Sequence, residues 1–407
     1  MGTRTEGIKY AGSKRLILPK IITAVSSLGA KTVLDGFSGT TRVGQHLKAS
    51  GYTVISNDIA DWSRVFGQCY LLNTKPAAHY QPMIDHLNSL KGVHSWFTEH
   101  YGGKDYGGSA VQPDGTKRIW QIHNTMKLDA IREEIDKLTT DETERAVLLT
   151  SLILALDKVD SSVGHQVSYL KMWSNRSYNT MKLKVPRLLI DDKPHEVHQG
   201  DIFDAAAKIG EVDVAYFDPP YGSSNDMMPS SRVRYASYYH IWKTVVLNDR
   251  PKLVGVANRR EDAGDKVSGS VFEEFRKNEQ GNFIALEAIK DLIGQTNAKT
   301  VILSYSNNGR ATAVGLKNIL DELNLRFRLI EFDHKTHVMS SMKWTNDWIN
   351  QSVQKGTKEY LFVIEKKPSE LFETVEQSRL SETLHVALPP AQLGLQRPAY
   401  SSSPENS

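Results

Sequence analysis

The sequence has little cysteine, no long apolar run and little net charge, and the first two of these absences exclude whole classes of protein. Cys69 is the single cysteine among 407 residues, which excludes an internal disulfide and a multi-cysteine zinc site. No apolar stretch approaches the ~20 residues that span a bilayer, and the N-terminus lacks a signal-peptide core. We therefore expect a cytoplasmic protein of bacterial or archaeal type without a membrane partner. The formal net charge of +3 permits nucleic-acid binding without indicating it.

Seven short apolar or β-branched runs, each bounded by turn residues or charges, are typical of buried strands. They lie at 31–35, 52–58, 195–199, 213–218, 300–305, 327–333 and 359–365. Amphipathic segments between several of them, such as 42–50 and 311–323, predict helices. This alternation favours an α/β fold with an open, Rossmann-like, seven-stranded and mostly parallel sheet.

The second and third predicted strands are separated by about 135 residues, far more than an ordinary connection. Within this insertion, 128–138 and 142–159 have apolar residues at helical spacing, whereas 101–117 is rich in Gly, Tyr, Lys and Asp and predicts a loop. From about residue 368 the sequence is rich in Ser, Pro, Gln and Glu. We predict a discontinuous α/β domain at 1–60 and 195–367, a largely helical inserted subdomain at 61–194, and a disordered tail at 368–407.

A glycine-containing turn follows the first predicted strand in the segment LDGFSGTTRVGQHL. In an open α/β sheet such a turn lies at the carboxyl edge, where ligands bind. The spacing of Gly36, Gly39 and Gly44 fits neither the dinucleotide fingerprint nor the Walker loop. Asp58 ends the second predicted strand, where a carboxylate can accept hydrogen bonds from both hydroxyls of a ribose. The pattern favours a cofactor with a free ribose, although a glycine turn and a strand-end acid occur in many α/β folds.

Asp218, Pro219, Pro220 and Tyr221 follow the apolar run VDVAYF. Two prolines cannot continue a sheet ladder, so the strand ends there and leaves the Asp218 carboxylate and the Pro219 carbonyl as acceptors. Two acceptors suit an exocyclic amine, because they draw a weakly nucleophilic nitrogen such as adenine N6 toward tetrahedral geometry. Tyr221 offers a flat face to a base extruded from a duplex. The alternative is a simple strand-ending turn with a surface tyrosine.

The motifs KYAGSK at 9–14, FSGT at 37–40, NDI at 57–59, GDIFD at 200–204 and DPPY at 218–221 together resemble the D12 class of adenine-N6-specific DNA methyltransferases. Their order is similar to that of the alpha group, in which the insertion reads the DNA sequence. The resemblance runs from about residue 9 to residue 367 and implies a class I S-adenosylmethionine-dependent methyltransferase fold. It also implies site-specific methylation of adenine N6 in double-stranded DNA, as by the modification enzyme of a restriction-modification system. A separately acting cognate restriction endonuclease is compatible with this reading.

The resemblance also assigns roles to matching residues. S-adenosylmethionine would donate its methyl group directly and become S-adenosylhomocysteine, with no metal required. The residues expected at the cofactor are Lys9, Tyr10, Lys14, Asp35, Phe37, Ser38, Gly39, Thr40, Asp58, Ile59, Asp201 and Ile202, and those expected in catalysis are Asp218, Pro219, Pro220 and Tyr221. Lys9, Tyr10 and Lys14 would approach the methionine part and the sulfonium. Asp58 would bind the ribose, and Asp201 would lie beside the adenine.

Thr41 departs from the family pattern, because many relatives have glycine there. We therefore expect a turn that is tighter or more rigid than usual, although threonine can adopt ordinary φ angles at low cost. The backbone contact at this position is thereby in doubt. Cofactor binding should nevertheless be retained.

Basic residues interleaved with aromatic residues predict phosphate contacts. The residues expected to contact DNA are Lys117, Arg118, Lys171 and Arg176 in the insertion, and Arg232, Arg234 and Tyr235 after the DPPY motif. Any one of these basic residues could instead belong to an ordinary charged surface that is exposed to solvent and does not contact DNA. The base sequence that is recognised does not follow from the spacing.

Two other functions remain compatible with the sequence. A cytosine-N4 methyltransferase needs the same two acceptors, although the acidic first residue of the DPPY motif favours adenine. A catalytically silent DNA-binding relative would keep the fold, although the intact Asp218, Tyr221 and Asp58 argue against it. A C5-cytosine mechanism needs a positioned cysteine, and Cys69 instead fits a buried or incidental thiol. The HEVH segment at 195–198 lacks the spacing of a metal-binding HExxH helix and predicts a strand.

Overall fold

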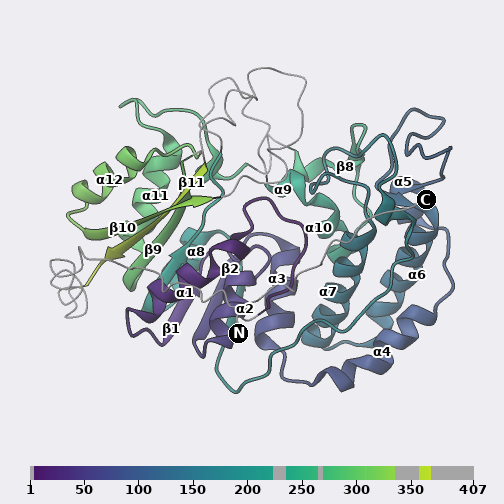
Figure 1. The fold of residues 1–407 in the computed structure, drawn as a ribbon, viewed down its shortest axis with the longest axis horizontal. Helices are drawn as coiled ribbons and strands as arrows, with labels where there is room; N and C mark the ends of the chain where they lie inside the picture. The colour runs from purple at the N-terminus through teal and green to yellow at the C-terminus, as the bar shows by residue number, and fades with distance from the viewer. Residues whose placement is uncertain (1–3, 223–234, 265–268, 308, 335–356, 368–407) are drawn as a thin grey trace, which may run out of the picture. The chain divides into compact units, whose positions relative to one another are not determined.

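A seven-stranded sheet forms the centre of the fold in the computed structural model, which describes residues 4–222, 235–264, 269–307, 309–334 and 357–367 (Figure 1). Its strands are β1 (Thr32–Asp35), β2 (Thr53–Asp58), β5 (Glu196–Gln199), β6 (Val212–Phe217), β9 (Ala298–Ser306), β10 (Arg326–His334) and β11 (Thr357–Glu365). They lie in the order β10-β11-β9-β6-β1-β2-β5. Strand β11 is antiparallel to both neighbours, and the other adjacent pairs are parallel. The predicted open, mostly parallel sheet is confirmed, and all seven strands match predicted runs.

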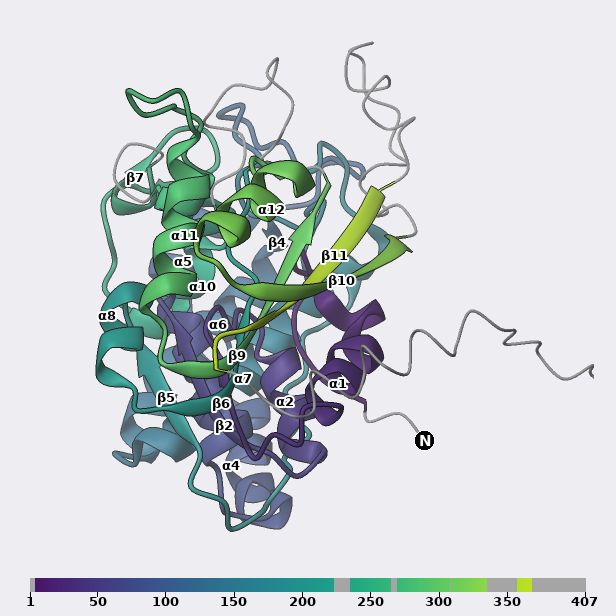
Figure 2. The same ribbon diagram turned by 90° about the vertical axis from the view of Figure 1, so that its left-hand side faces the viewer.

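Helices cover both faces of this sheet (Figure 2). One face carries α1 (Leu18–Ser26) and α2 (Arg42–Ala49), and the other carries α8 (Ile202–Lys208), α11 (Ile284–Gln295) and α12 (Ala313–Glu322). The second face buries a continuous apolar core in which Phe217 of β6 and Phe362 of β11 are fully covered. The helices predicted at 42–50 and 311–323 are therefore confirmed as α2 and α12.

The insertion between β2 and β5 is mostly helical, as predicted. Its elements are α3 (Asp61–Gly67), a π-helical turn (Gln68–Leu72), α4 (Ala77–Ser89), α5 (Trp96–Tyr101), β3 (Gly102–Gly103), β4 (Trp120–Gln121), α6 (Ile122–Leu138), α7 (Glu142–Val159) and a 3-10 turn (Asn175–Tyr178). Helix α7 begins where the Asp141 carboxylate accepts the N–H of Glu144 at 2.8 Å, which satisfies one unpaired helix donor. No helix in the described ranges has both the length and the apolarity needed to cross a membrane.

The insertion shares its apolar core with a helix from the second half of the chain. After β6 come α9 (Tyr235–Tyr238), α10 (His240–Leu247), β7 (Leu253–Val254), β8 (Arg259–Arg260) and two 3-10 turns (Glu261–Ala263 and Val271–Glu273). Helix α10 packs against α3 and α7, and its Trp242 lies in the same core as Trp120 of the insertion. The insertion is thus anchored to the part of the chain that follows the DPPY motif. The predicted tail at 368–407 lies outside the described residues.

Candidate active site

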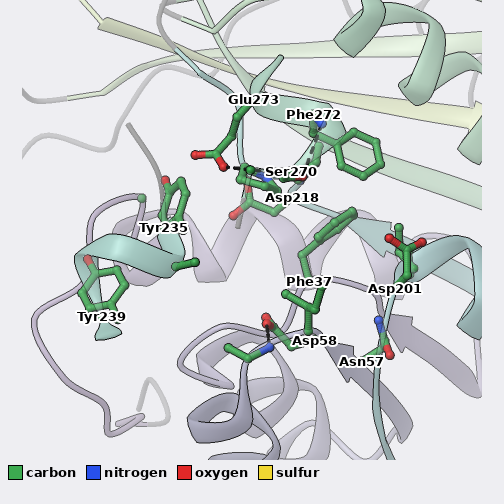
Figure 3. Close-up of a pocket in the computed structure, with 18 of the residues that line it drawn as sticks. Phe37, Asn57, Asp58, Asp201, Asp218, Tyr235, Tyr239, Ser270, Phe272 and Glu273 are labelled. Carbon is green, nitrogen blue, oxygen red and sulfur yellow. Dashed lines mark hydrogen bonds between the residues drawn. The ribbon is translucent and has the colours of Figure 1, made fainter. Parts of the chain in front are cut away.

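Four parallel strands end at the same edge of the sheet and open into one cavity of about 560 Å³ (Figure 3). Strand β1 leads to Gly36 and Phe37, β2 ends at Asp58, β5 leads to Asp201 and β6 leads to Asp218. Small-molecule sites usually occupy ~300–1,000 Å³ and lie at this edge of α/β sheets. The cavity is therefore the candidate active site.

The cavity collects most of the residues singled out by the sequence. Its lining includes Tyr10, Phe37, Asp58, Ile59, Asp201, Ile202, Asp218, Pro219, Pro220, Tyr221 and Tyr235. The other residues predicted at the cofactor lie outside the lining: Lys9, Lys14, Asp35, Ser38, Gly39 and Thr40. The fold thus brings the DPPY motif and both strand-end acids to one space.

Backbone constraints shape the turn after β1. Gly39 has a φ of 47°, in the left-handed region that favours glycine, and its N–H donates to Asp58 Oδ2 at 2.7 Å. A side chain at Gly36 would collide with Phe217, because an added Cβ would lie 2.6 Å from that ring. The turn therefore holds the chain close to both β2 and β6.

Thr41 also adopts a left-handed conformation, with φ 58° and ψ 16°, rather than one of the φ angles that threonine adopts at low cost. This region is sterically unfavourable for a β-branched residue. Two short backbone hydrogen bonds fix it: its N–H donates to the Ser38 carbonyl at 2.6 Å, and its carbonyl accepts from Gln45 at 2.8 Å. Since Thr41 is fully buried, packing of the turn rather than residue preference sets this angle.

Asp58 is a half-buried acceptor to which backbone N–H groups donate. Its Oδ2 accepts from Gly39 and its Oδ1 accepts the N–H of Ala60 at 2.9 Å. Burial raises the pKa of Asp58, and these backbone donors oppose the shift. The side chain also lines the cavity, so its carboxylate can accept from donors inside that space.

Asp218 forms an ion pair with Lys14, whose Nζ lies 3.0 Å from Oδ1. The same ammonium donates to the Tyr221 hydroxyl at 3.0 Å and to Glu359 Oε1. Asp218 lines the cavity, and its side chain is 17% exposed although the Oδ1 atom is buried. The exposed part of the carboxylate is therefore on the side of Oδ2, which faces the cavity. Burial raises the pKa of Asp218 to about 7, with Lys14 opposing the shift and Glu359 adding to it. The site thus contains one buried cation between two carboxyl groups.

Aromatic rings enclose the space around Asp218. Tyr10 stacks on Tyr239 with ring centroids 4.7 Å apart and lies 5.6 Å from Tyr235. The Tyr221 ring packs against Tyr305 at 4.9 Å and also faces the cavity. These ring faces suit a flat, planar ligand.

Two of the predicted acids have hydrogen bonds that shape the neighbouring helices. Asp35 Oδ2 accepts the N–H of Gly44 in α2 at 3.1 Å, and burial raises the pKa of Asp35 to about 8. Asp201 caps α8, where its Oδ1 accepts the N–H of Phe203 at 2.9 Å. Asp201 also lines the cavity, whereas Asp35 lies behind it.

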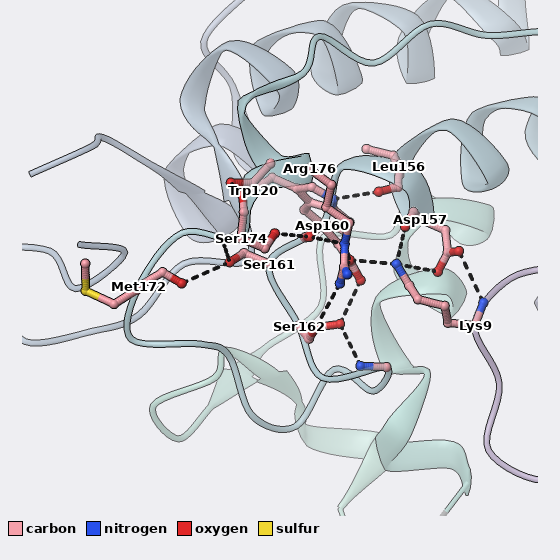
Figure 4. A network of polar contacts seen from close by, with 12 residues as sticks. Lys9, Trp120, Leu156, Asp157, Asp160, Ser161, Ser162, Met172, Ser174 and Arg176 are labelled. Atoms are coloured by element: carbon pink, nitrogen blue, oxygen red, sulfur yellow. Dashed lines mark hydrogen bonds and ion pairs between the residues drawn. The ribbon is translucent and has the colours of Figure 1, made fainter. Parts of the chain in front are cut away.

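Lys9 lies outside the cavity lining, in a polar network with the insertion (Figure 4). Its Nζ is 2.8 Å from Asp160 Oδ1 and also donates to the Asp157 carbonyl. Arg176 approaches Asp160 as well, with Nη2 2.6 Å from Oδ1, and it donates to the Ser162 carbonyl at 2.8 Å. The network ties the N-terminal segment to the end of α7.

The remaining residues predicted to contact DNA have different environments. Lys171 is exposed and Lys117 is half-buried, whereas Arg118 is mostly covered and donates to the His100 carbonyl at 2.8 Å. The Ala110 N–H donates to the Lys171 carbonyl at 2.8 Å, which brings the segment at 109–118 beside that lysine. Arg232 and Arg234 lie outside the described residues. DNA contact by this set stays a prediction.

Two expectations outside the cavity are confirmed. Cys69 is fully buried, and burial raises the pKa of its thiol, as expected for an incidental thiol. The HEVH segment ends in strand β5 rather than in a helix. In the described part of the chain, no three His, Cys, Asp or Glu side chains group as a metal site.

Several residues of the site escaped the sequence analysis: Glu359, Lys243, Asp262, Ser270, Phe272 and Glu273. Ser270 and Glu273 form a capping box around a 3-10 turn, so the SVFE segment carried a recognisable signal. Glu359 carried only a weak signal, an acid at the start of the apolar run EYLFVIE, because its partner Lys14 is 345 residues away. Lys243 and Asp262 pair at 3.0 Å across the cavity wall, which no local pattern indicates.

The fold and the site together define a class of protein. A seven-stranded sheet with one antiparallel strand, a glycine turn after β1 and an acid at the end of β2 is the class I S-adenosylmethionine-dependent methyltransferase fold. The sequence matches the family described as D12 class N6 adenine-specific DNA methyltransferase over residues 10–280. The chain belongs to this family.

Curated relatives are modification methylases of similar sequence. Modification methylase StsI of Streptococcus sanguinis is 30% identical over 381 residues, which cover 89% of this chain and 52% of that protein. Type II methyltransferase M.FokI of Planomicrobium okeanokoites is 25% identical over 384 residues, covering 88% and 53%. M.NlaIII of Neisseria lactamica is 23% identical over 368 residues, covering 88% and 99%. The chain thus spans about half the length of the first two relatives and nearly all of the third.

Proposed function

We propose that this protein transfers a methyl group from S-adenosylmethionine to the exocyclic N6 of adenine at a specific sequence in double-stranded DNA. The observation that carries the proposal is one cavity shared by the Asp218–Tyr221 motif and Asp58. This cavity would offer acceptors for an amine beside an acceptor for a ribose. Membership of the adenine-specific family supports adenine over cytosine, and the modification methylases among the relatives support a restriction-modification role.

The side chains of the cavity fit S-adenosylmethionine. Asp58 would accept hydrogen bonds from the ribose hydroxyls, since it ends β2 and lines the cavity. Phe37 and Ile59 offer apolar surface for a purine, and Ile59 is 71% exposed although it lines the cavity. The Tyr10 ring would lie close to a sulfonium cation. The bound cofactor supplies an electrophilic methyl group.

The DPPY motif would hold and activate the substrate amine. The cavity-facing oxygen of Asp218 and the Pro219 carbonyl accept its two N–H groups and aim the nitrogen at the methyl group. The Tyr221 ring stacks on the extruded base. With a pKa of about 7, the Asp218 carboxylate can hold the proton that the amine loses after methylation. The enclosing aromatic rings keep water away from these groups.

The DNA would lie across the insertion, residues 61–194, and the segment after DPPY. Lys171 and Lys117 come from adjacent segments of the insertion and are available to phosphates. Tyr235 lines the cavity and would contact the extruded nucleotide. A cognate restriction endonuclease that acts separately is the protein partner consistent with a modification enzyme.

Labelled methyl transfer to unmethylated genomic DNA tests this proposal, with nucleoside analysis and mapping of the modified positions. The wild type should yield N6-methyladenine at one short motif, and Asp218→Ala should reduce kcat by roughly 1,000-fold, because the main acceptor of the amine is lost. Asp204→Ala is the matched control, since this aspartate is exposed on α8 and does not line the cavity. N4-methylcytosine as the product would favour the cytosine alternative. DNA binding without any methylated product would favour a silent relative.

A further inference from the structure

Glu359 is a buried acid on β11 that reaches the candidate active site through Lys14. It is 3% exposed, its Oε1 accepts from Lys14 Nζ, and the same atom accepts from Ser304 Oγ on β9 at 3.3 Å. Position 359 lies beyond residues 10–280, the part of the chain that matches the family. Family membership therefore assigns this residue no role.

The position of the Lys14 ammonium is determined by three oxygen atoms. Its Nζ donates to Glu359 Oε1 and to the Tyr221 hydroxyl at 3.0 Å, and it forms an ion pair with Asp218 Oδ1 at 3.0 Å. The Lys14 side chain is 7% exposed and that of Glu359 is 5% exposed, so water does not compete for these donors. A lysine on a flexible four-carbon stem is fixed here only by the groups that it touches.

Glu359 supplies the contact that is not itself part of the DPPY motif. Asp218 and Tyr221 both line the cavity, whereas Glu359 belongs to a strand behind it. We propose that Glu359 is a positioning residue for methyl transfer: it anchors Lys14, and Lys14 in turn holds Asp218 with one oxygen toward the substrate amine. This inference rests on the proposed function.

The charge of Glu359 also acts on the titration of Asp218. The titratable groups that interact with Asp218 are Lys14, Asp35, Tyr10, Tyr216, Tyr221, Tyr235 and Glu359. Lys14 lowers the pKa of Asp218 and Glu359 raises it. Neutralising Glu359 removes one raising charge, so the pKa of Asp218 should fall.

Glu359→Gln tests the proposal in the full-length protein, with S-adenosylmethionine and DNA as substrates. We expect kcat to fall roughly 10- to 100-fold, because Lys14 then pairs with Asp218 alone and shifts its carboxylate from the substrate amine, while KM for both substrates stays within about twofold. The acidic limb of the kcat/KM profile should move to lower pH. Glu365→Gln is the matched control, because Glu365 is 5% exposed on the same strand but pairs with Arg326 at 2.7 Å, far from Lys14 in the strand register. It should leave kcat and the limb unchanged.

Thermal melting and cofactor titration establish that each variant is folded. If folded Glu359→Gln has the wild-type kcat and its kcat/KM profile keeps its acidic limb at the wild-type pH, the positioning role is overturned and the proposed function is left intact. The positioning role would also be overturned if Glu365→Gln moved the acidic limb of the kcat/KM profile by the same amount as Glu359→Gln. If Glu359→Gln does not fold, Glu359→Asp serves instead, because it keeps the charge on a shorter side chain. This variant should lose kcat without moving the acidic limb of the kcat/KM profile. Wild-type kcat in Glu359→Asp would overturn the proposal. Absence of methylated DNA from the wild type would instead contradict the proposed function.

Discussion

Lys9 and Lys14 are five positions apart in the N-terminal segment, and each pairs with carboxylates in a cluster of its own. The two clusters differ in location and in burial. The Lys14 side chain is 7% exposed and meets Asp218 at the cavity. The Lys9 side chain is 35% exposed and meets Asp157 and Asp160 at the end of α7. One cluster touches the candidate reacting atoms, and the other connects the segment to the insertion. The comparison suggests a rule: burial beside the cavity, and not charge pairing alone, distinguishes the candidate catalytic cluster from the structural one.

The largest effect is expected from Lys14→Met, which removes the cation between the buried Glu359 and the half-buried Asp218. We expect the free energy of unfolding at pH 8 to fall by about 3–5 kcal/mol, because Asp218 and Glu359 are left without a counterion. Methyl transfer should be lost as well. Urea denaturation and the methylation assay measure the two effects. A loss below about 1 kcal/mol would show that the cluster is solvated, in contradiction to its burial.

Asp160→Asn tests the structural cluster. It weakens charge-assisted contacts from both Lys9 and Arg176, so the free energy of unfolding should fall by about 1.5–3 kcal/mol. The kcat of the folded variant should stay within about threefold of the wild type. Glu142→Gln is the control, because it breaks a pair with Arg64 in which both side chains are exposed and which contributes about 0–1 kcal/mol. A large loss of kcat in Asp160→Asn would mean that the Lys9 cluster also positions the reacting groups.

The pH dependence should separate activity from stability. Since the proposed chemistry needs the Asp218 carboxylate and its pKa is about 7, kcat/KM should fall about tenfold per pH unit below that value. The free energy of unfolding should change in the opposite direction. The pKa of Asp218 is higher in the folded protein than in the unfolded chain, so its contribution to stability is fully present below the unfolded pKa of about 4. That contribution is lost as the pH rises through the folded pKa of about 7. Asp35, with a pKa of about 8, adds a change of the same sign. Rates and melting temperatures between pH 5 and 8 check both trends, and parallel trends would contradict the assignment.

The smallest expected effect comes from Thr41→Gly, which lies in neither cluster. Glycine relieves the left-handed strain of about 1–3 kcal/mol but costs about 0.5–1 kcal/mol in chain entropy, so we expect a stabilisation of about 1 kcal/mol. The KM for the cofactor should not change, because the backbone path is retained. Urea denaturation measures the effect. A destabilised variant would show that the buried threonine methyl group contributes more than its strain costs.

The sequence was most informative for features that are determined by residues adjacent in the chain, such as the ends of strands. A short apolar run stopped by two prolines marks the end of β6 and places Asp218 at the cavity without knowledge of any other residue. A carboxylate at the end of β2 was recognisable in the same way. These features repeat along the chain, which is why all seven strands were predicted.

The sequence was least informative where two distant residues determine each other. The pairing of Lys14 with Glu359 depends on where β11 enters the sheet, and no short pattern shows that. Lys9 was expected near the cofactor, yet its position outside the cavity lining depends on the end of α7. The angle at Thr41 depends on packing around the whole turn, which overrides the preference of the residue.

The position of β11 has a consequence for how the protein forms during translation. Of the seven sheet strands, β11 comes last along the chain, but it lies between β9 and β10 and bonds to both. A nascent chain that ends before residue 357 already contains the DPPY motif, yet β10 then has no neighbour to join it to the sheet. Glu359 arrives only with this final strand, so Lys14 acquires its anchor after every other part of the proposed site has been synthesised. Completion of the sheet is therefore also the step that completes the proposed catalytic site.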